Sequence, residues 1–137
     1  MYHIGIDLGG TNIVAGILRE SDIAPLLSFR SCSSDDSQPF AFCGSCLLYK
    51  ESIPTLPSRS AEEIMADAAS LARTVAHSAG VDFRDVTSIG FVSPGTVNPV
   101  SGVVEFAGNV PFNNFDAKLH LRHNTGIDKI TVDNDAN

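Results

Sequence analysis

The stretch from Asp7 to Thr11 places a carboxylate, two glycines and a hydroxyl within one short turn. The adjacent Gly9 and Gly10 let backbone N–H groups approach an anion closely, and the hydroxyl of Thr11 adds a further donor. The carboxylate of Asp7 is an oxygen ligand of the kind that holds the magnesium ion accompanying a nucleotide phosphate. The spacing matches neither the P-loop pattern nor the G-x-G-x-x-G dinucleotide pattern. A pair of glycines between two strands is also typical of a simple turn, so this motif alone leaves its role open.

Two polar loops later in the chain carry further candidate binding groups. The sequence SPGTVNP, residues 93–99, follows a buried strand at its carboxyl end, where open α/β sheets place their ligand loops. Its Pro and Gly are more simply explained as turn residues. The sequence AGNVPFNN, residues 107–114, is an amide-rich polar loop, and amides suit sugar hydroxyls as well as they suit their own backbone. Neither loop decides a function alone.

The chain ends on DNDAN, residues 133–137, directly after a short apolar strand. We expect this segment to open a helix, where one of its acids or amides would serve as an N-cap. A carboxylate at a helix N-terminus is also kept ionised by the helix dipole, which suits a general base. The spacing alone does not choose between a cap and a base.

The elements that position these groups follow an α/β pattern. The clearest is a helix from Ser60 to Ala79, with an S-x-x-E capping box at Ser60 and Glu63 and with Gly80 at the C′ position. One face of this helix is apolar and must pack on a sheet. A second, shorter helix is predicted from Asp116 to His123. The apolar face consists of Ile64, Ala68, Leu71, Val75 and Ala79.

The strands predict a mixed sheet. The first two are separated by a glycine turn and should form an antiparallel hairpin, whereas strand–helix–strand alternation in the second half implies parallel pairing. Helices should cover this sheet. The predicted strands are His3 to Asp7, Asn12 to Leu18, Leu47 to Ile53, Val86 to Val92 and Ile130 to Val132.

Residues 21–46 show neither the helical nor the strand periodicity of apolar residues. This serine-rich segment is predicted to be an insertion or loop within a hairpin, because a structureless stretch of this length is unusual in a compact domain. It holds all three cysteines, of which Cys43 and Cys46 have the C-x-x-C spacing. A zinc site needs further ligands, and none lies nearby at ligand spacing, so we interpret the cysteines as reduced bystander thiols.

Composition and charge narrow the class of protein. The 137 residues suit one globular domain, and no apolar run approaches the roughly 20 residues that a membrane-spanning helix needs. The net charge of −7 disfavours nucleic acid and anionic lipid as partners. The N-terminus has no basic region before its apolar residues, and an acid stands at position 7, so a cytoplasmic location is the simplest expectation.

Four blocks together are more specific than any one of them. IGIDLGGTN (4–12), IGFVSPGTV (89–97), GNVPF (108–112) and VDNDAN (132–137) occur in an order and approximate spacing that resemble the ROK family of bacterial sugar kinases and sugar-responsive repressors. Bacterial glucokinase typifies this family. The resemblance covers the chain except residues 21–46.

The resemblance implies an actin-like, ribonuclease-H-like ATPase domain that uses ATP and Mg²⁺ to phosphorylate a hexose or amino sugar. Asp7 would also be the residue that holds the metal. Two positions depart from the family pattern, with Asn98 where an acid is common and Gly108 where proline is common, and they bear on sugar preference more than on reaction type. The matching positions are Asp7, Gly9, Gly10 and Thr11 for the nucleotide phosphate, Gly95, Asn109 and Asn134 for the sugar, and Asp135 for the catalytic base.

Members of this family continue past the DNDAN block into a second domain that carries further sugar contacts, a zinc motif and the rest of the ATP site. Residues 1–137 are therefore expected to be an N-terminal half, inactive alone and without the family's structural zinc. The alternatives are a sugar-sensing repressor and a non-catalytic remnant. A repressor is disfavoured because no DNA-binding helix-turn-helix precedes the first strand. The particular sugar stays open, as does the oligomeric state, with a homodimer among the alternatives.

Overall fold

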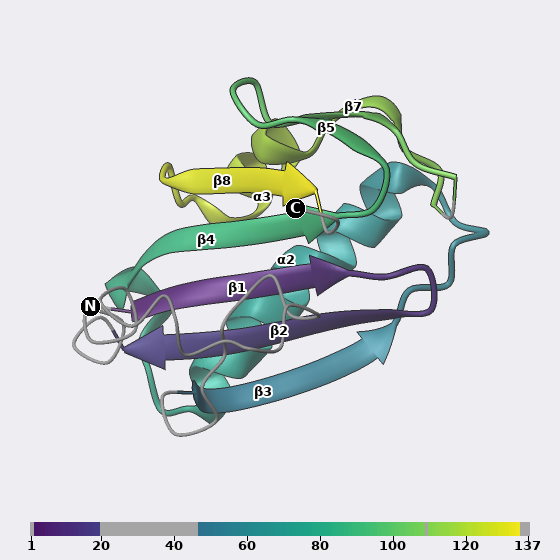
Figure 1. The fold of residues 1–137 in the computed structure, drawn as a ribbon. Coiled ribbons are helices and arrows are strands. Elements are labelled where there is room, and N and C mark those ends of the chain that lie inside the picture. The colour runs from purple at the N-terminus through teal and green to yellow at the C-terminus, as the bar shows by residue number, and fades with distance from the viewer. Residues whose placement is uncertain (1, 20–46, 109, 135–137) are drawn as a thin grey trace, which may run out of the picture.

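A computed structural model describes residues 2–19, 47–108 and 110–134. Its main feature is a five-stranded sheet in the order β3–β2–β1–β4–β8 (Figure 1). The predicted insertion at residues 21–46, with its cysteines, lies outside the described residues. The strands of this sheet, in spatial order, are Leu47–Pro54, Asn12–Arg19, Tyr2–Leu8, Val86–Ser93 and Ile130–Asn134.

The sheet is mixed, as the sequence predicts. β1 pairs antiparallel with β2, and β2 antiparallel with β3, whereas β1 with β4 and β4 with β8 are parallel pairs. The carboxyl ends of the three parallel strands therefore meet at one edge of the sheet. The first hairpin turn, the segment after β4 and the last residue of β8 lie at this edge.

Helix α2, Ala61–Ser78, begins and ends as its sequence predicts. The hydroxyl of Ser60 accepts a hydrogen bond from the backbone N–H of Glu63 at 3.2 Å and donates one to the Glu63 carboxylate at 3.2 Å. After the helix, Gly80 has a φ of 75°, which a glycine adopts without strain. The predicted apolar face is buried, apart from Ala79, which is partly buried against the core.

Helix α3, Ala117–Thr125, follows the same rules at its ends. Asp116 is its N-cap and accepts from the backbone N–H of Leu119, and Gly126 ends it with a φ of 77°. Figure 1 shows α2 crossing behind the sheet, and α3 packs against α2 and β8. The aliphatic side chains that the sheet turns toward the helices include Ile6 and Ile13, which are fully buried.

A second, three-stranded antiparallel sheet was missed by the sequence prediction, which placed two of its segments in the loops at 93–99 and 107–114 and assigned no structure to the third. It consists of β5, β6 and β7 in that order. These strands are only three or four residues long and mostly exposed, so they lack the sustained alternation of apolar and polar residues that identifies a strand. A short 3₁₀ helix, η2, Phe83–Asp85, was also not predicted. The strand bounds are Thr96–Asn98 for β5, Val103–Phe106 for β6 and Asn113–Asp116 for β7.

The small sheet shares its core with the large one. Phe112 and Phe115 are buried and stack with their ring centroids 4.8 Å apart, and His120 of α3 stacks on Phe115 at 4.4 Å. Val104 of β6 is fully buried in the same cluster as the aliphatic residues of β1 and β4. The segments after β4 are thus fixed to the main sheet rather than loosely attached to it.

Candidate functional site

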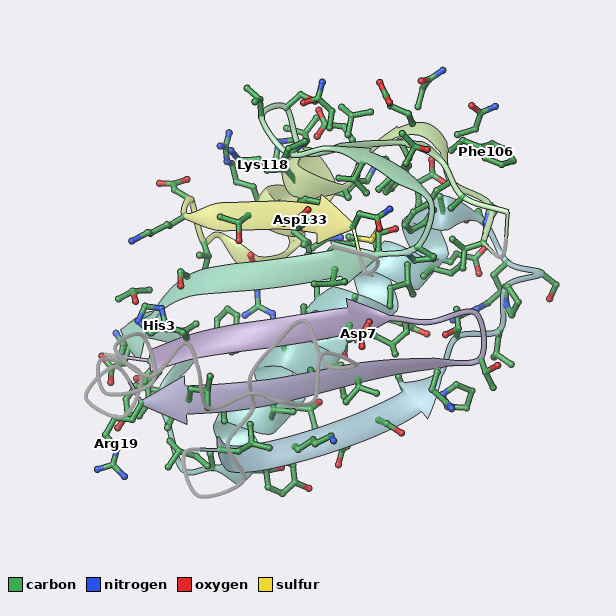
Figure 2. The ribbon with its side chains drawn as sticks, in the orientation of Figure 1. His3, Asp7, Arg19, Phe106, Lys118 and Asp133 are labelled. Atoms are coloured by element: carbon green, nitrogen blue, oxygen red, sulfur yellow. The ribbon has the colours of Figure 1, made fainter. Side chains whose placement is uncertain are left out.

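Two carboxylates line up at the carboxyl edge of the parallel strands. Asp7 of β1 is paired with Val92 of β4, and Val92 is paired with Asp133 of β8. Residues in one row of a sheet point to the same face, so both acids lie on the face opposite the buried Ile6. Two strand spacings separate their backbones by roughly 10 Å. Figure 2 shows both side chains close to the carboxyl ends of their strands.

The turn between β1 and β2 is tight and leaves donors available. The backbone N–H of Gly9 donates to the carbonyl of Asn12 at 2.9 Å, and a Cβ at Gly9 would come within 3.1 Å of that carbonyl oxygen. Within the described part of the chain, no hydrogen-bond partner is found for the backbone N–H groups of Gly10 and Thr11. These two amides are suited to an anion.

Thr55 holds this turn from the far end of β3. Its side-chain hydroxyl donates to the carbonyl of Gly9 at 2.7 Å, and its backbone N–H donates to the carbonyl of Thr11 at 2.9 Å. Thr55 is one of few fully buried polar residues in the described ranges. The sequence prediction missed it, because a threonine after the proline that ends a strand gives no signal beyond that of a loop residue.

Arg59 supports Thr55 in turn. Its guanidinium donates to the carbonyl of Thr55 at 2.8 Å and forms an ion pair with Asp67 of α2 at 2.7 Å. The ion pair is partly exposed, so it serves more to orient the guanidinium than to stabilise the fold. Asp67 of α2 is thereby connected to the turn at Gly9.

Gly95 is required by close packing. Its φ is 87°, and a Cβ there would lie 2.0 Å from the carbonyl oxygen of Phe106 and 2.7 Å from the Cα of Ala107. No side chain fits in that space. The predicted sugar loops at 93–99 and 107–114 are therefore brought into direct backbone contact.

The third predicted sugar residue lies beside them. Asn134 of β8 is paired with Ser93, the last residue of β4, and Ser93 is fully buried with its hydroxyl donating to the carbonyl of Pro94. β5, which begins just after Gly95, also contacts β8. Gly95 and Asn134 thus lie at one corner of the sheet. The other two predicted residues, Asn109 and Asp135, lie outside the described residues.

Few other features of the described ranges compete with this edge as a site. No cluster of three or more metal-ligating side chains occurs among the residues that the structure describes. A groove of about 270 Å³ between β3 and α2 contains none of the candidate residues. At η2, hydrogen bonds from Arg84 lower the pKa of the Asp82 carboxyl, but both are exposed surface groups before the amino end of β4. No helix in the described ranges is long and apolar enough to span a membrane.

The arrangement is that of an actin-like ATPase domain, and several solved structures share it. No protein-family model and no curated protein matches the chain. By structure, the whole chain matches 36% of the ROK hexokinase from Thermus thermophilus, with a TM-score of 0.70 and 28% identity. It matches 34% of a ROK family glucokinase from Streptomyces griseus, solved in complex with glucose and AMPPNP, with a TM-score of 0.70 and 27% identity.

A ROK family transcriptional regulator, a homolog of the E. coli MLC protein, matches 97% of the chain with a TM-score of 0.68, and at 17% identity that likeness shows the fold alone. In fold and in its four sequence blocks, the chain is similar to these ROK family kinases. The chain spans about a third of the length of these solved structures.

Proposed function

We propose that residues 1–137 supply the phosphate-binding turn, the catalytic base and part of the sugar pocket of an ATP-dependent kinase for a hexose or amino sugar. The observation that carries this proposal is convergence at one edge. The turn at Gly9–Thr11, the carboxylate of Asp7, the backbone contact at Gly95 and the end of β8 at Asn134 all lie where the parallel strands end. Ligands of open α/β sheets bind at this edge.

The phosphate side is built for an anion and a hard cation. The amides of Gly10 and Thr11 would donate to phosphate oxygens. The carboxylate of Asp7 fits Mg²⁺, which prefers oxygen ligands and takes most of its coordination from phosphates and water. When bound, Mg²⁺ would neutralise charge on the transferred phosphoryl group.

The sugar side would orient the acceptor hydroxyl. Asn134 and Asn109 would hydrogen-bond the sugar through amide groups that both donate and accept. The tight backbone at Gly95 would form a wall of the pocket. Asp135 would accept the proton of the attacking hydroxyl, in a reaction where positioning matters more than the strength of the base.

Asp135→Asn tests the proposed base in a chimera that joins residues 1–137 to the part of the Streptomyces griseus glucokinase beyond the matched region. Asparagine keeps the size of the side chain but accepts no proton, so kcat should fall by about 10²- to 10⁴-fold while ATP and glucose bind nearly as before. Steady-state kinetics and calorimetry measure the two effects. If Asp135 were only a helix cap, asparagine would replace it and kcat would barely change.

Asp133→Asn is the matched control. It removes the same charge two residues earlier, and asparagine keeps an oxygen that can accept from the backbone N–H of Asn134, as the Asp133 carboxylate does at 2.7 Å. Turnover should stay within about tenfold of the parent chimera, because the Asp133 charge would act on the reaction only through space. An inactive Asp133→Asn with a near-normal Asp135→Asn would overturn the assignment.

A further inference from the structure

Gly10 lies between Gly9 and Thr11, and the backbone carbonyls of both neighbours accept hydrogen bonds from the buried Thr55. Thr55 donates its hydroxyl to the carbonyl of Gly9 and its backbone N–H to the carbonyl of Thr11. The second bond continues the ladder between β2 and β3, which ends at the pairing of Asn12 with Pro54. The first depends on the threonine side chain and has no equivalent in regular sheet structure.

The hydroxyl bond sets the direction of the amide that follows. In a planar trans peptide the C=O and the next N–H point in opposite directions. Because Thr55 is fully buried and draws the carbonyl of Gly9 inward, the N–H of Gly10 in the same peptide must point away from Thr55. The hydrogen bond between the N–H of Gly9 and the carbonyl of Asn12 prevents the turn from opening at its base.

Thr55 is itself held in place. Arg59 donates to its carbonyl at 2.8 Å, and the same guanidinium is paired with Asp67 of α2. Since the charge of Arg59 is engaged by that carboxylate, Arg59 is better suited to orient the backbone of Thr55 than to bind a phosphate. A series of contacts thus runs from α2 through Arg59 and Thr55 to the turn.

We propose that Thr55, supported by Arg59, is a positioning residue that fixes the Gly9–Thr11 turn with its Gly10 amide aimed at the nucleotide phosphate. This rests on the proposed function of the turn as a phosphate site. Thr55 touches no substrate. It acts by keeping the donor preorganised, so its loss should weaken phosphate binding more than it disturbs the rest of the fold.

Thr55→Val in the 137-residue chain is the principal test, because valine keeps the shape and removes only the hydroxyl. Backbone amide exchange by NMR reports the order of the turn through the N–H groups of Gly9 and Thr55, and a titration with Mg·ATP reports binding. Loss of one such hydrogen bond should speed exchange of these amides and weaken Mg·ATP binding by about five- to thirtyfold each. Thr55→Ser keeps the hydroxyl and should restore both quantities to within about threefold of the parent chain.

Thr125→Val is the matched control for stability. Thr125 is also buried, and its hydroxyl donates to a backbone carbonyl, that of Leu121, at 2.6 Å at the end of α3. This variant should lower the melting temperature without changing exchange at Gly9 or the affinity for Mg·ATP. Arg59→Gln, a change at a partly exposed side chain, should give a smaller effect of the same kind and keeps the test available if Thr55→Val does not fold.

The outcomes separate this inference from the proposed function. A Thr55→Val chain with a lowered melting temperature but unchanged exchange at Gly9 and unchanged affinity would overturn the positioning role. If the parent chain itself binds no Mg·ATP, the phosphate role of the turn fails in this chain. Whether Thr55 positions the turn is then decided by amide exchange alone. Equal exchange in the parent chain and in Thr55→Val would overturn the positioning role.

Discussion

The turn at Gly9–Thr11 and the turn at Gly95 lie at the same edge of the sheet but are held by different forces. The first is held by hydrogen bonds from Thr55, a residue 46 positions beyond Gly9. The second is held by packing so close that a single added carbon would lie 2.0 Å from a backbone oxygen. The turn at Gly9–Thr11 therefore depends on the hydrogen bonds that Thr55 donates, whereas the turn at Gly95 depends on the lack of a side chain at that glycine.

This difference predicts different responses to substitution. A missing hydrogen bond costs a limited amount and leaves the backbone near its place, whereas an impossible contact must displace one strand or the other. The proposed sugar side should accordingly be more sensitive than the proposed phosphate side. Substitutions at both ends of the edge can test that ranking.

Phe112→Ala should have the largest effect on the sugar side. Phe112 is 1% exposed and stacks on Phe115, and its carbonyl accepts from the N–H of Ala107, which closes the segment around the predicted Asn109. Removing a buried phenyl ring leaves a cavity and should cost about 3–5 kcal/mol of unfolding free energy. Urea unfolding followed by circular dichroism measures the loss. A change below about 1 kcal/mol would contradict the burial of Phe112 in the shared core.

Phe106→Ser is the matched control on the neighbouring strand. Phe106 is 62% exposed, and Figure 2 shows it at the outer margin of the small sheet. Its removal should alter unfolding free energy by no more than about 0.5 kcal/mol, because little apolar area leaves the core. Comparing Phe112→Ala with Phe106→Ser therefore separates the effect of burial from the effect of removing an aromatic ring.

Gly95→Ala should come next in size. An alanine must adopt a φ of 87° and overlap the backbone of Phe106 and Ala107. We expect a cost of about 3 kcal/mol, made up of backbone strain and displacement of β6. Thermal unfolding measures this cost. Amide exchange should increase at Ala107 and Phe112 while the N–H of Gly9 is unaffected.

Substitutions at two other glycines separate the cost of backbone strain at Gly95 from the cost of its close contact with β6. Gly126 has a φ of 77°, but a Cβ at this position would have no neighbouring atom within 4 Å, so Gly126→Ala should cost only about 1–2 kcal/mol of backbone strain. Gly108 has neither a left-handed φ nor a close neighbour, and Gly108→Ala should be nearly neutral. Equal losses at Gly95 and Gly126 would show that the contact with Phe106 is relieved without cost.

The sequence predicted the large sheet and both helices because their signals are local and repeated. The apolar face of α2 recurs at helical spacing, and Ser60 and Gly80 mark its two ends. The strands of the main sheet are rich in β-branched residues and bounded by turns. The small sheet was not predicted, because β5 and β7 carry asparagines and few apolar residues, and their pairing with β6 depends on contacts that no short window contains.

Residues of the candidate site could be predicted only where they form a motif. Asp7 and the glycine turn are recognisable as a short pattern, and the structure places Asp7 with Gly95 and Asn134 at one edge. Thr55 was not predicted because its role depends on its position beside Gly9 in space. The roles of Asn109 and Asp135 remain predictions from the family resemblance, since both lie outside the described residues.

Ser60→Ala should have the smallest effect on unfolding free energy. It tests the proposed phosphate side at the N-cap of α2, beside Arg59 in the series of contacts to the Gly9–Thr11 turn. The hydroxyl of Ser60 caps α2 by accepting from the N–H of Glu63, and Ser60 directly follows Arg59, which supports Thr55. Loss of an N-cap costs about 1 kcal/mol of stability, and Ser60→Asp should retain this stability because aspartate caps equally well.

If the turn at Gly9 depends on contacts that begin at the first turn of α2, exchange of the Gly9 amide should rise slightly in Ser60→Ala and stay normal in Ser60→Asp. Exchange at Ala107, on the sugar side, should be the same in both variants, since that segment is held by packing and not by this series of hydrogen bonds. A rise at Ala107 equal to that at Gly9 would mean that the two turns are coupled through the whole sheet and are not held separately.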